Sequence, residues 1–138
     1  MTKQEIDYIV EGLIDSVGSS NLMDIINGLD IKLITKDGIT TRYVKRKGLQ
    51  LIYLDSGLNE EIKPFVLAHE IGHAILHDEE ISQYSPFDIL RTRTEREADY
   101  FAFKLLGKSI DPIYEFTAEQ YAMELGVNEE IIQYIVNK

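Results

Sequence analysis

The feature that most constrains this chain is the segment from Phe65 to His77, which reads Phe-Val-Leu-Ala-His-Glu-Ile-Gly-His-Ala-Ile-Leu-His. It contains His69, Glu70 and His73 in the order H-E-x-x-H. Because successive residues of an α-helix are about 100° apart, the two histidines lie one turn apart, where both imidazoles can bind one Zn²⁺. Glu70 lies at the edge of the same face, where a carboxylate can accept a proton from an attacking water. We therefore expect a helix with a metal site on its polar face.

The residues around the motif favour this interpretation. Pro64 suits the first position of a helix, so we expect the helix to run from about Pro64 to His77. Gly72 costs a helix about 1 kcal/mol relative to Ala, which indicates that another segment passes close to the ligands. The alternative is a surface helix with chance histidines, but all three histidines of the chain share this one stripe. A further set of residues is apolar and lies on the opposite face, toward a core: Leu67, Ala68, Ile71, Ala74 and Ile75.

A zinc site with two histidines needs a third protein ligand, and three residues are candidates. His77 lies about 12 Å along the helix axis from His69, whereas Zn–N bonds are only about 2 Å long. One ion cannot reach both ends of a straight helix, so we expect His77 behind the ligands, on the substrate side, or at the helix end as a cation. The remaining candidates are Glu95 and Glu97.

These two glutamates lie about 200° apart on a helix, so only one can face the metal. Glu95 projects toward the apolar face, where a bare carboxylate is costly unless a metal compensates it. Asp99, one turn on, is placed to accept a hydrogen bond from a ligand histidine. Glu97 is expected to point away from the metal and to form a capping box with Thr94. The alternatives are a capping box of Thr92 with Glu95 and a surface position for Asp99.

Hydrophobic periodicity predicts an α+β chain in which a small antiparallel β-meander packs against helices. Asp-Gly and Lys-Gly turns separate three short runs rich in β-branched and aromatic residues, which favours antiparallel strands. The motif helix and a second ligand helix would form a zinc cleft. The predicted helices are 2–17, 21–26, 64–77, 92–107, 117–125 and 128–136, and the predicted strands are 31–35, 39–45 and 49–54.

Length and composition exclude several other classes. With 138 residues we expect one domain, with N-terminal helices over 1–28, a zinc-binding core over 29–107 and a helical hairpin over 108–138. The chain has no cysteine, so it has no thiolate ligand or nucleophile, which fits a reducing cytosol. Its N-terminus lacks the apolar region of a signal peptide, and no apolar run is long enough to span a membrane. A net charge of −10 makes direct nucleic-acid binding an unfavourable hypothesis.

Two motifs together carry a family resemblance. The sequence H-E-I-G-H at 69–73, followed by E-x-x-A-D-x-F-A at 95–102, resembles the ImmA/IrrE family of zinc metallopeptidases and the wider gluzincin pattern. The resemblance covers about residues 29–107. It implies an α+β domain and a cytoplasmic location, often linked to phages or mobile elements. It also implies cleavage of a regulatory protein, such as a repressor with a helix-turn-helix.

Carried over by position, the resemblance implies one Zn²⁺ per chain, bound by His69, His73 and Glu95, with Glu70 as the base. The first functional hypothesis is therefore a zinc endopeptidase of narrow specificity. The strand over 49–54 would hold an extended substrate if it lay at a sheet edge. His77 and Tyr84 are candidates for the substrate or oxyanion side.

The second hypothesis is a metal-binding regulatory module that docks to a transcription factor or antitoxin with little or no proteolysis. An intact Glu70 favours the enzyme, because a protein that only binds a partner has no evident need for a general base.

Overall fold

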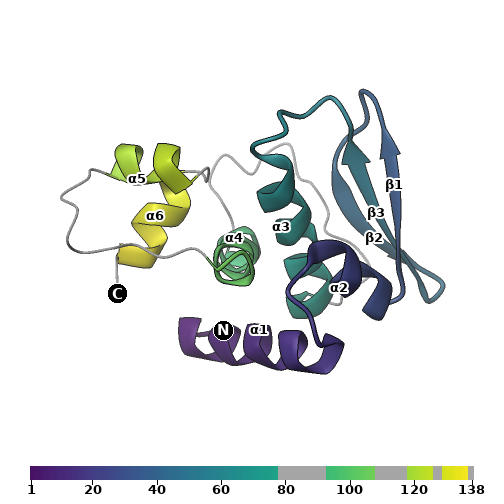
Figure 1. The fold of residues 1–138 in the computed structure, drawn as a ribbon, viewed down its shortest axis with the longest axis horizontal. Coiled ribbons are helices and arrows are strands. Elements are labelled where there is room, and N and C mark those ends of the chain that lie inside the picture. Colours follow the sequence, from purple (N-terminus) through teal and green to yellow (C-terminus); the bar gives the residue numbers. More distant parts are fainter. Residues whose placement is uncertain (78–92, 108–117, 126–128, 137–138) are drawn as a thin grey trace.

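The computed structural model describes residues 1–77, 93–107, 118–125 and 129–136 (Figure 1). The sheet and the helix pair α5/α6 lie at opposite ends of the view, with α3 and α4 between them. Tyr84, a candidate for the substrate or oxyanion side, lies outside the described residues. Within those ranges, no helix combines the length and apolarity needed to cross a bilayer. The elements in chain order are α1 (Lys3–Val17), α2 (Leu22–Gly28), β1 (Ile31–Lys36), β2 (Arg42–Arg46), β3 (Leu49–Asp55), α3 (Lys63–Leu76), α4 (Arg93–Leu105), α5 (Ala118–Leu125) and α6 (Glu129–Val136).

The three strands form one mixed sheet in the order β1-β3-β2. β2 and β3 are antiparallel, with Tyr43 opposite Ile52. They are joined by Lys47 and Gly48, whose φ angles of 53° and 80° are typical of the tight turn of a hairpin. β1, however, pairs with β3 in parallel, with Leu33 opposite Ile52. The α+β class is confirmed, whereas the antiparallel meander predicted for all three strands is wrong.

The reason is a crossover over residues 37–41, which passes the end of β3 before β2 begins. The backbone N–H of Gly38 donates to Oδ1 of Asp55 at 3.0 Å, and the N–H of Asp55 donates to Oγ1 of Thr41 at 2.9 Å. Two strand spacings amount to about 10 Å, a distance that five residues can span. β3 is thus the central strand, so the edge position considered for residues 49–54 is wrong. β1 and β2 are the edges of this sheet.

Helix α4 is buried on nearly all sides, unlike the amphipathic helix expected from its sequence. Its residues from Glu97 to Phe103 are all buried, because α3, α1 and α6 each pack against it. On the side of α1, the hydroxyl of Tyr100 donates to Oδ1 of Asp7 at 2.8 Å. α4 is therefore enclosed by α1, α3 and α6 (Figure 1), and its buried charged side chains must find partners inside the protein.

Gly72 lies at a close approach of α3 to α4. A Cβ at this position would lie 3.0 Å from Cδ1 of Phe101 and 3.3 Å from the Cα and O atoms of Ala98. The segment that was expected to pass close to this glycine is therefore α4. The missing side chain lets the motif helix and the helix that carries Glu95 come into contact.

We predict that Gly72→Ala lowers the free energy of unfolding by about 1–3 kcal/mol, the usual cost of overpacking. Both contacts resist movement, because Phe101 is fully buried and Ala98 contributes backbone atoms. Gly12→Ala is the matched control, since Gly12 also lies within a helix but has nothing within 4 Å of its Cβ position. That control should gain up to about 1 kcal/mol. Equal stabilisation of both variants in thermal unfolding would contradict the close helix contact.

Candidate metal centre

Three side chains converge between α3 and α4. Nε2 of His69 lies 3.1 Å from Nε2 of His73. One carboxylate oxygen of Glu95 lies 3.1 Å from Nε2 of His69, and the other lies 2.7 Å from Nε2 of His73. The two histidines are buried, whereas the Glu95 side chain is 36% exposed. The site thus combines two buried histidines with one carboxylate that reaches solvent.

These residues fit a zinc ion in number, kind and spacing. Two imidazoles and one carboxylate form a donor set of catalytic zinc sites, in which a fourth position stays open. Ligand atoms about 2.1 Å from a tetrahedral ion lie roughly 3.4 Å apart. Two of the three separations above are close to that value and the third is shorter. His69, His73 and Glu95 are also the group in the described residues that could hold a metal ion.

Asp99 lies directly behind His69. Its side chain is almost completely buried, and Oδ1 lies 2.7 Å from Nδ1 of His69. Since an ionised carboxylate can only accept, this contact favours a proton on Nδ1, so that Nε2, which faces Glu95 and His73, is the ring nitrogen that can bind a metal once it carries no proton. The structure therefore brings Asp99 to the position expected for a residue that orients a ligand histidine.

Glu70 is buried beside the two histidines and receives a hydrogen bond from the backbone N–H of Tyr43 in β2. Burial raises the pKa of its carboxyl group, while charge on His69 and His73 opposes the rise. Sequence reasoning missed the contribution of Tyr43, because the contact uses a backbone atom and leaves no signature in residue type. It ties the expected base to the sheet edge formed by β2.

His77 and Glu97 form a second, partly buried contact on the far side of His73. Nδ1 of His77 lies 3.1 Å from Nδ1 of His73, and Nε2 of His77 lies 2.9 Å from Oε1 of Glu97. The N-terminal ammonium of Met1 lies 3.0 Å from Oε2 of Glu97. As expected, Glu97 points away from the group that could hold a metal, but it is buried against His77, and the expectation that it caps the helix with Thr94 is wrong. The helix begins at Arg93, so Thr94 is inside it, and α1 and α3 enclose the side on which Glu97 lies.

The electrostatics of the site favour a positive charge at its centre. Burial alone would lower the pKa of His69, but the hydrogen bonds that its ring donates to Asp99 and Glu95 outweigh this effect and raise the pKa to about 9. For Glu95, burial raises the pKa, yet the hydrogen bonds to His69 and His73 dominate and hold it well below its usual range. Without metal, a proton on His69 supplies the cation that these carboxylates surround.

We predict that zinc affinity rises with pH up to about pH 9. Below that value the imidazole of His69 in the metal-free protein carries an extra proton. This proton must leave Nε2 before that nitrogen can bind zinc. The apparent affinity should rise by up to about tenfold per pH unit and then level off. A competition titration against a chelator, in one-unit steps from about pH 7 and corrected for protonation of the chelator, measures this. A flat affinity would contradict the raised pKa.

Comparison with known proteins gives the class to which this geometry belongs. Residues 27–136 match the family described as IrrE N-terminal-like domain, a peptidase family, and the chain belongs to it. The family expected from the two motifs is thereby confirmed, and the protein falls in a class of metallopeptidases. The chain is similar to the metallopeptidase ImmA of Bacillus subtilis (strain 168), at 25% identity over 147 residues, which covers 96% of this chain and 85% of that protein.

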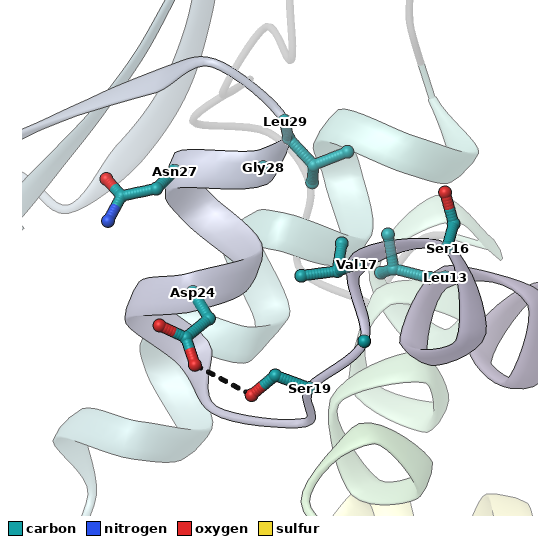
Figure 2. Close-up of a pocket in the computed structure, with 9 residues that line it drawn as sticks. Leu13, Ser16, Val17, Ser19, Asp24, Asn27, Gly28 and Leu29 are labelled. Atoms are coloured by element: carbon teal, nitrogen blue, oxygen red, sulfur yellow. Dashed lines mark hydrogen bonds between the residues drawn. The ribbon is translucent and has the colours of Figure 1, made fainter.

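A separate surface pocket of about 540 Å³ lies between the end of α1 and α2 (Figure 2). The one charged side chain labelled in it, Asp24, accepts a hydrogen bond from Ser19 at 2.8 Å. Val17 and Gly28 pack at its wall, with 3.1 Å between a valine methyl group and the Cβ position of the glycine. None of the metal-site residues lines this pocket, so it is not part of the candidate centre.

Proposed function

We propose that this protein is a zinc-dependent endopeptidase of narrow specificity, with one Zn²⁺ held by His69, His73 and Glu95 and with Glu70 as the general base. The observation that carries the proposal is the convergence of these three ligand atoms beside a buried glutamate that accepts a hydrogen bond from the backbone of β2. Membership of a metallopeptidase family supports it.

The residues divide the chemistry between them. Zinc, when bound, polarises the carbonyl of the peptide bond to be cleaved and lowers the pKa of its water. The carboxylate of Glu70 accepts the proton of the attacking water and later passes it to the leaving amine. Its raised pKa suits this exchange, because a general base works best when its pKa approaches the operating pH. The hydrogen bond from the backbone N–H of Tyr43 favours the charged form of this carboxylate.

An extended substrate would bind beside β2. This strand is an edge of the sheet, it packs against α3, and its Tyr43 contacts Glu70. A peptide strand added to such an edge gains main-chain hydrogen bonds and would run past the proposed base. This position replaces residues 49–54, which lie in the centre of the sheet.

The proposed substrate is a regulatory protein, such as a repressor with a helix-turn-helix, in a cytoplasmic and phage- or mobile-element-linked setting. This part rests on the family resemblance. The second hypothesis, a regulatory module that docks without cleavage, is weakened by Glu70. Burying a carboxylate that has no task in the protein costs free energy, whereas a general base in this place explains both its burial and its hydrogen bond.

The test is cleavage that depends on zinc. Zinc-loaded protein is incubated with the helix-turn-helix protein encoded by a neighbouring gene and, separately, with a peptide mixture from a digested proteome. New chain ends are then identified by mass spectrometry. We expect a small set of cleavage sites that disappear with a chelator and return with Zn²⁺. Cleavage that persists after complete removal of metal would contradict the proposal. Tight binding of the repressor by zinc-loaded protein without any cleavage would favour the docking module instead.

A further inference from the structure

We infer that His77 and Glu97 form a relay that positions His73 for metal binding, as Asp99 does for His69. This inference rests on the proposed zinc site. It assigns a task to two residues that take no part in the chemistry itself. His77 and Glu97 are positioning residues, because they act on the metal through His73.

The directions of the hydrogen bonds carry the argument. When Nε2 of His73 binds a metal, the one proton of its neutral ring lies on Nδ1. The acceptor at hand is Nδ1 of His77, 3.1 Å away. A neutral His77 that accepts at Nδ1 carries its own proton on Nε2, which faces Oε1 of Glu97 at 2.9 Å. Each step has one donor and one acceptor, so the relay permits one orientation of each ring.

The burial of the relay indicates a specific purpose. The side chain of Glu97 is only 8% exposed and that of His77 only 17%. Both ring nitrogens of His77 are engaged within the protein, which argues against a role for this residue on the substrate side. A buried carboxylate is costly unless it is paired. One oxygen of Glu97 contacts His77, which in turn contacts the far side of His73, and the other oxygen lies 3.0 Å from the N-terminal ammonium of Met1.

Helix α4 would then supply three carboxylates with different tasks. Glu95 is the proposed ligand, Asp99 contacts His69 directly at 2.7 Å, and Glu97 reaches His73 through His77. Glu97 and Asp99 lie two residues apart and therefore on different sides of the helix. The intermediate histidine bridges the longer path from Glu97 to the second ligand. Carboxylate–histidine–zinc contacts of this kind usually change metal affinity by 10–100-fold when removed.

The first test is a set of zinc affinities measured by chelator competition on the full chain. His77→Ala and Glu97→Ala should each weaken binding by roughly 10–100-fold. The double variant should be no weaker than the worse single variant, because both residues act in one relay. Glu97→Ala combined with Asp99→Ala should instead show the product of the two single losses, because these residues orient different histidines. If Glu97→Ala folds poorly, Glu97→Gln is measured in its place. This variant keeps the volume of the side chain and should show a smaller loss of zinc affinity.

Tyr100→Phe is the matched control for a purely structural effect. It removes a hydrogen bond of the same helix α4, to Asp7 in α1, and should leave zinc affinity unchanged. A loss of affinity in this control equal to that of Glu97→Ala would overturn the inference, because any loosening of α4 would then suffice.

The second test observes the hydrogen bond itself. In zinc-loaded, ¹⁵N-labelled protein, NMR should detect a proton on Nδ1 of His73 that is also coupled through the hydrogen bond to Nδ1 of His77. This coupling should vanish in His77→Ala. In His77→Asn, the side-chain oxygen can accept in place of Nδ1, so part of the zinc affinity should return.

The outcomes separate the two levels of the argument. If the wild-type chain binds no zinc, the proposed function fails and the relay fails with it. If the wild type binds zinc but His77→Ala and Glu97→Ala bind it equally well, only the relay is overturned. The relay is also overturned if the double variant loses zinc affinity by the product of the His77→Ala and Glu97→Ala losses. That result would show that the two residues act independently.

Discussion

Glu70→Gln is expected to lower peptide hydrolysis by at least about 10²-fold, the low end of the contribution of a general base. The amide is nearly isosteric with the carboxylate but cannot accept the proton of the attacking water. Because Glu70 is absent from the proposed ligand set, the variant should keep its zinc. The measurement is the rate of cleavage of the substrate that the wild type cleaves, followed by mass spectrometry.

Glu61→Gln serves as the control for this prediction. Glu61 is an exposed glutamate just before α3, so the same chemical change there should leave both rate and metal content unaltered. Turnover by Glu70→Gln at close to the wild-type rate, in protein with full zinc, would rule out the proposed mechanism. A loss of zinc in Glu70→Gln would instead show that the glutamate acts in binding the metal.

Glu95→Ala is expected to lose zinc during purification, because it removes the one carboxylate that contacts both histidines of the site. His69→Ala and His73→Ala should lose the metal for the same reason, since three protein ligands are needed for a catalytic zinc site. The effect should exceed the 10–100-fold change expected for a residue behind the ligands. Elemental analysis of the purified variants gives the zinc content per chain.

Glu97→Ala provides the comparison on the same helix. It lies two residues from Glu95 and is more deeply buried, yet it should retain zinc at stoichiometric protein concentrations, with only a weakened affinity. Full zinc in Glu95→Ala together with complete loss in Glu97→Ala would show that the wrong glutamate has been assigned as the ligand.

Much of the site could be predicted because its residues lie on two regular helices. One helical turn separates His69 from His73, and another separates Glu95 from Asp99, so the spacing alone predicts which side chains share a face. The structure brings all four of these residues together. The positions of the helices along the chain could be predicted for a related reason, since helical periodicity is a local property.

Partners that depend on the arrangement of whole elements could not be predicted. Alternating hydrophobicity indicates which face of a strand is buried but not which strand lies beside it, so the parallel pairing of β1 with β3 was missed. For Glu97, helical periodicity suggested a solvent-exposed side. That side is enclosed because α1, from the start of the chain, packs on α4. The contact of Glu70 with Tyr43 uses a backbone amide, which any residue type would supply.

The most direct test of the central claim is a crystal structure of the zinc-loaded protein with diffraction data on both sides of the zinc absorption edge. The account predicts one anomalous peak per chain, within about 2.0–2.2 Å of Nε2 of His69, Nε2 of His73 and a carboxylate oxygen of Glu95. It also predicts that Glu70 lies beside the peak without binding it. A peak at other residues, or no peak in protein that cleaves its substrate, would contradict the account.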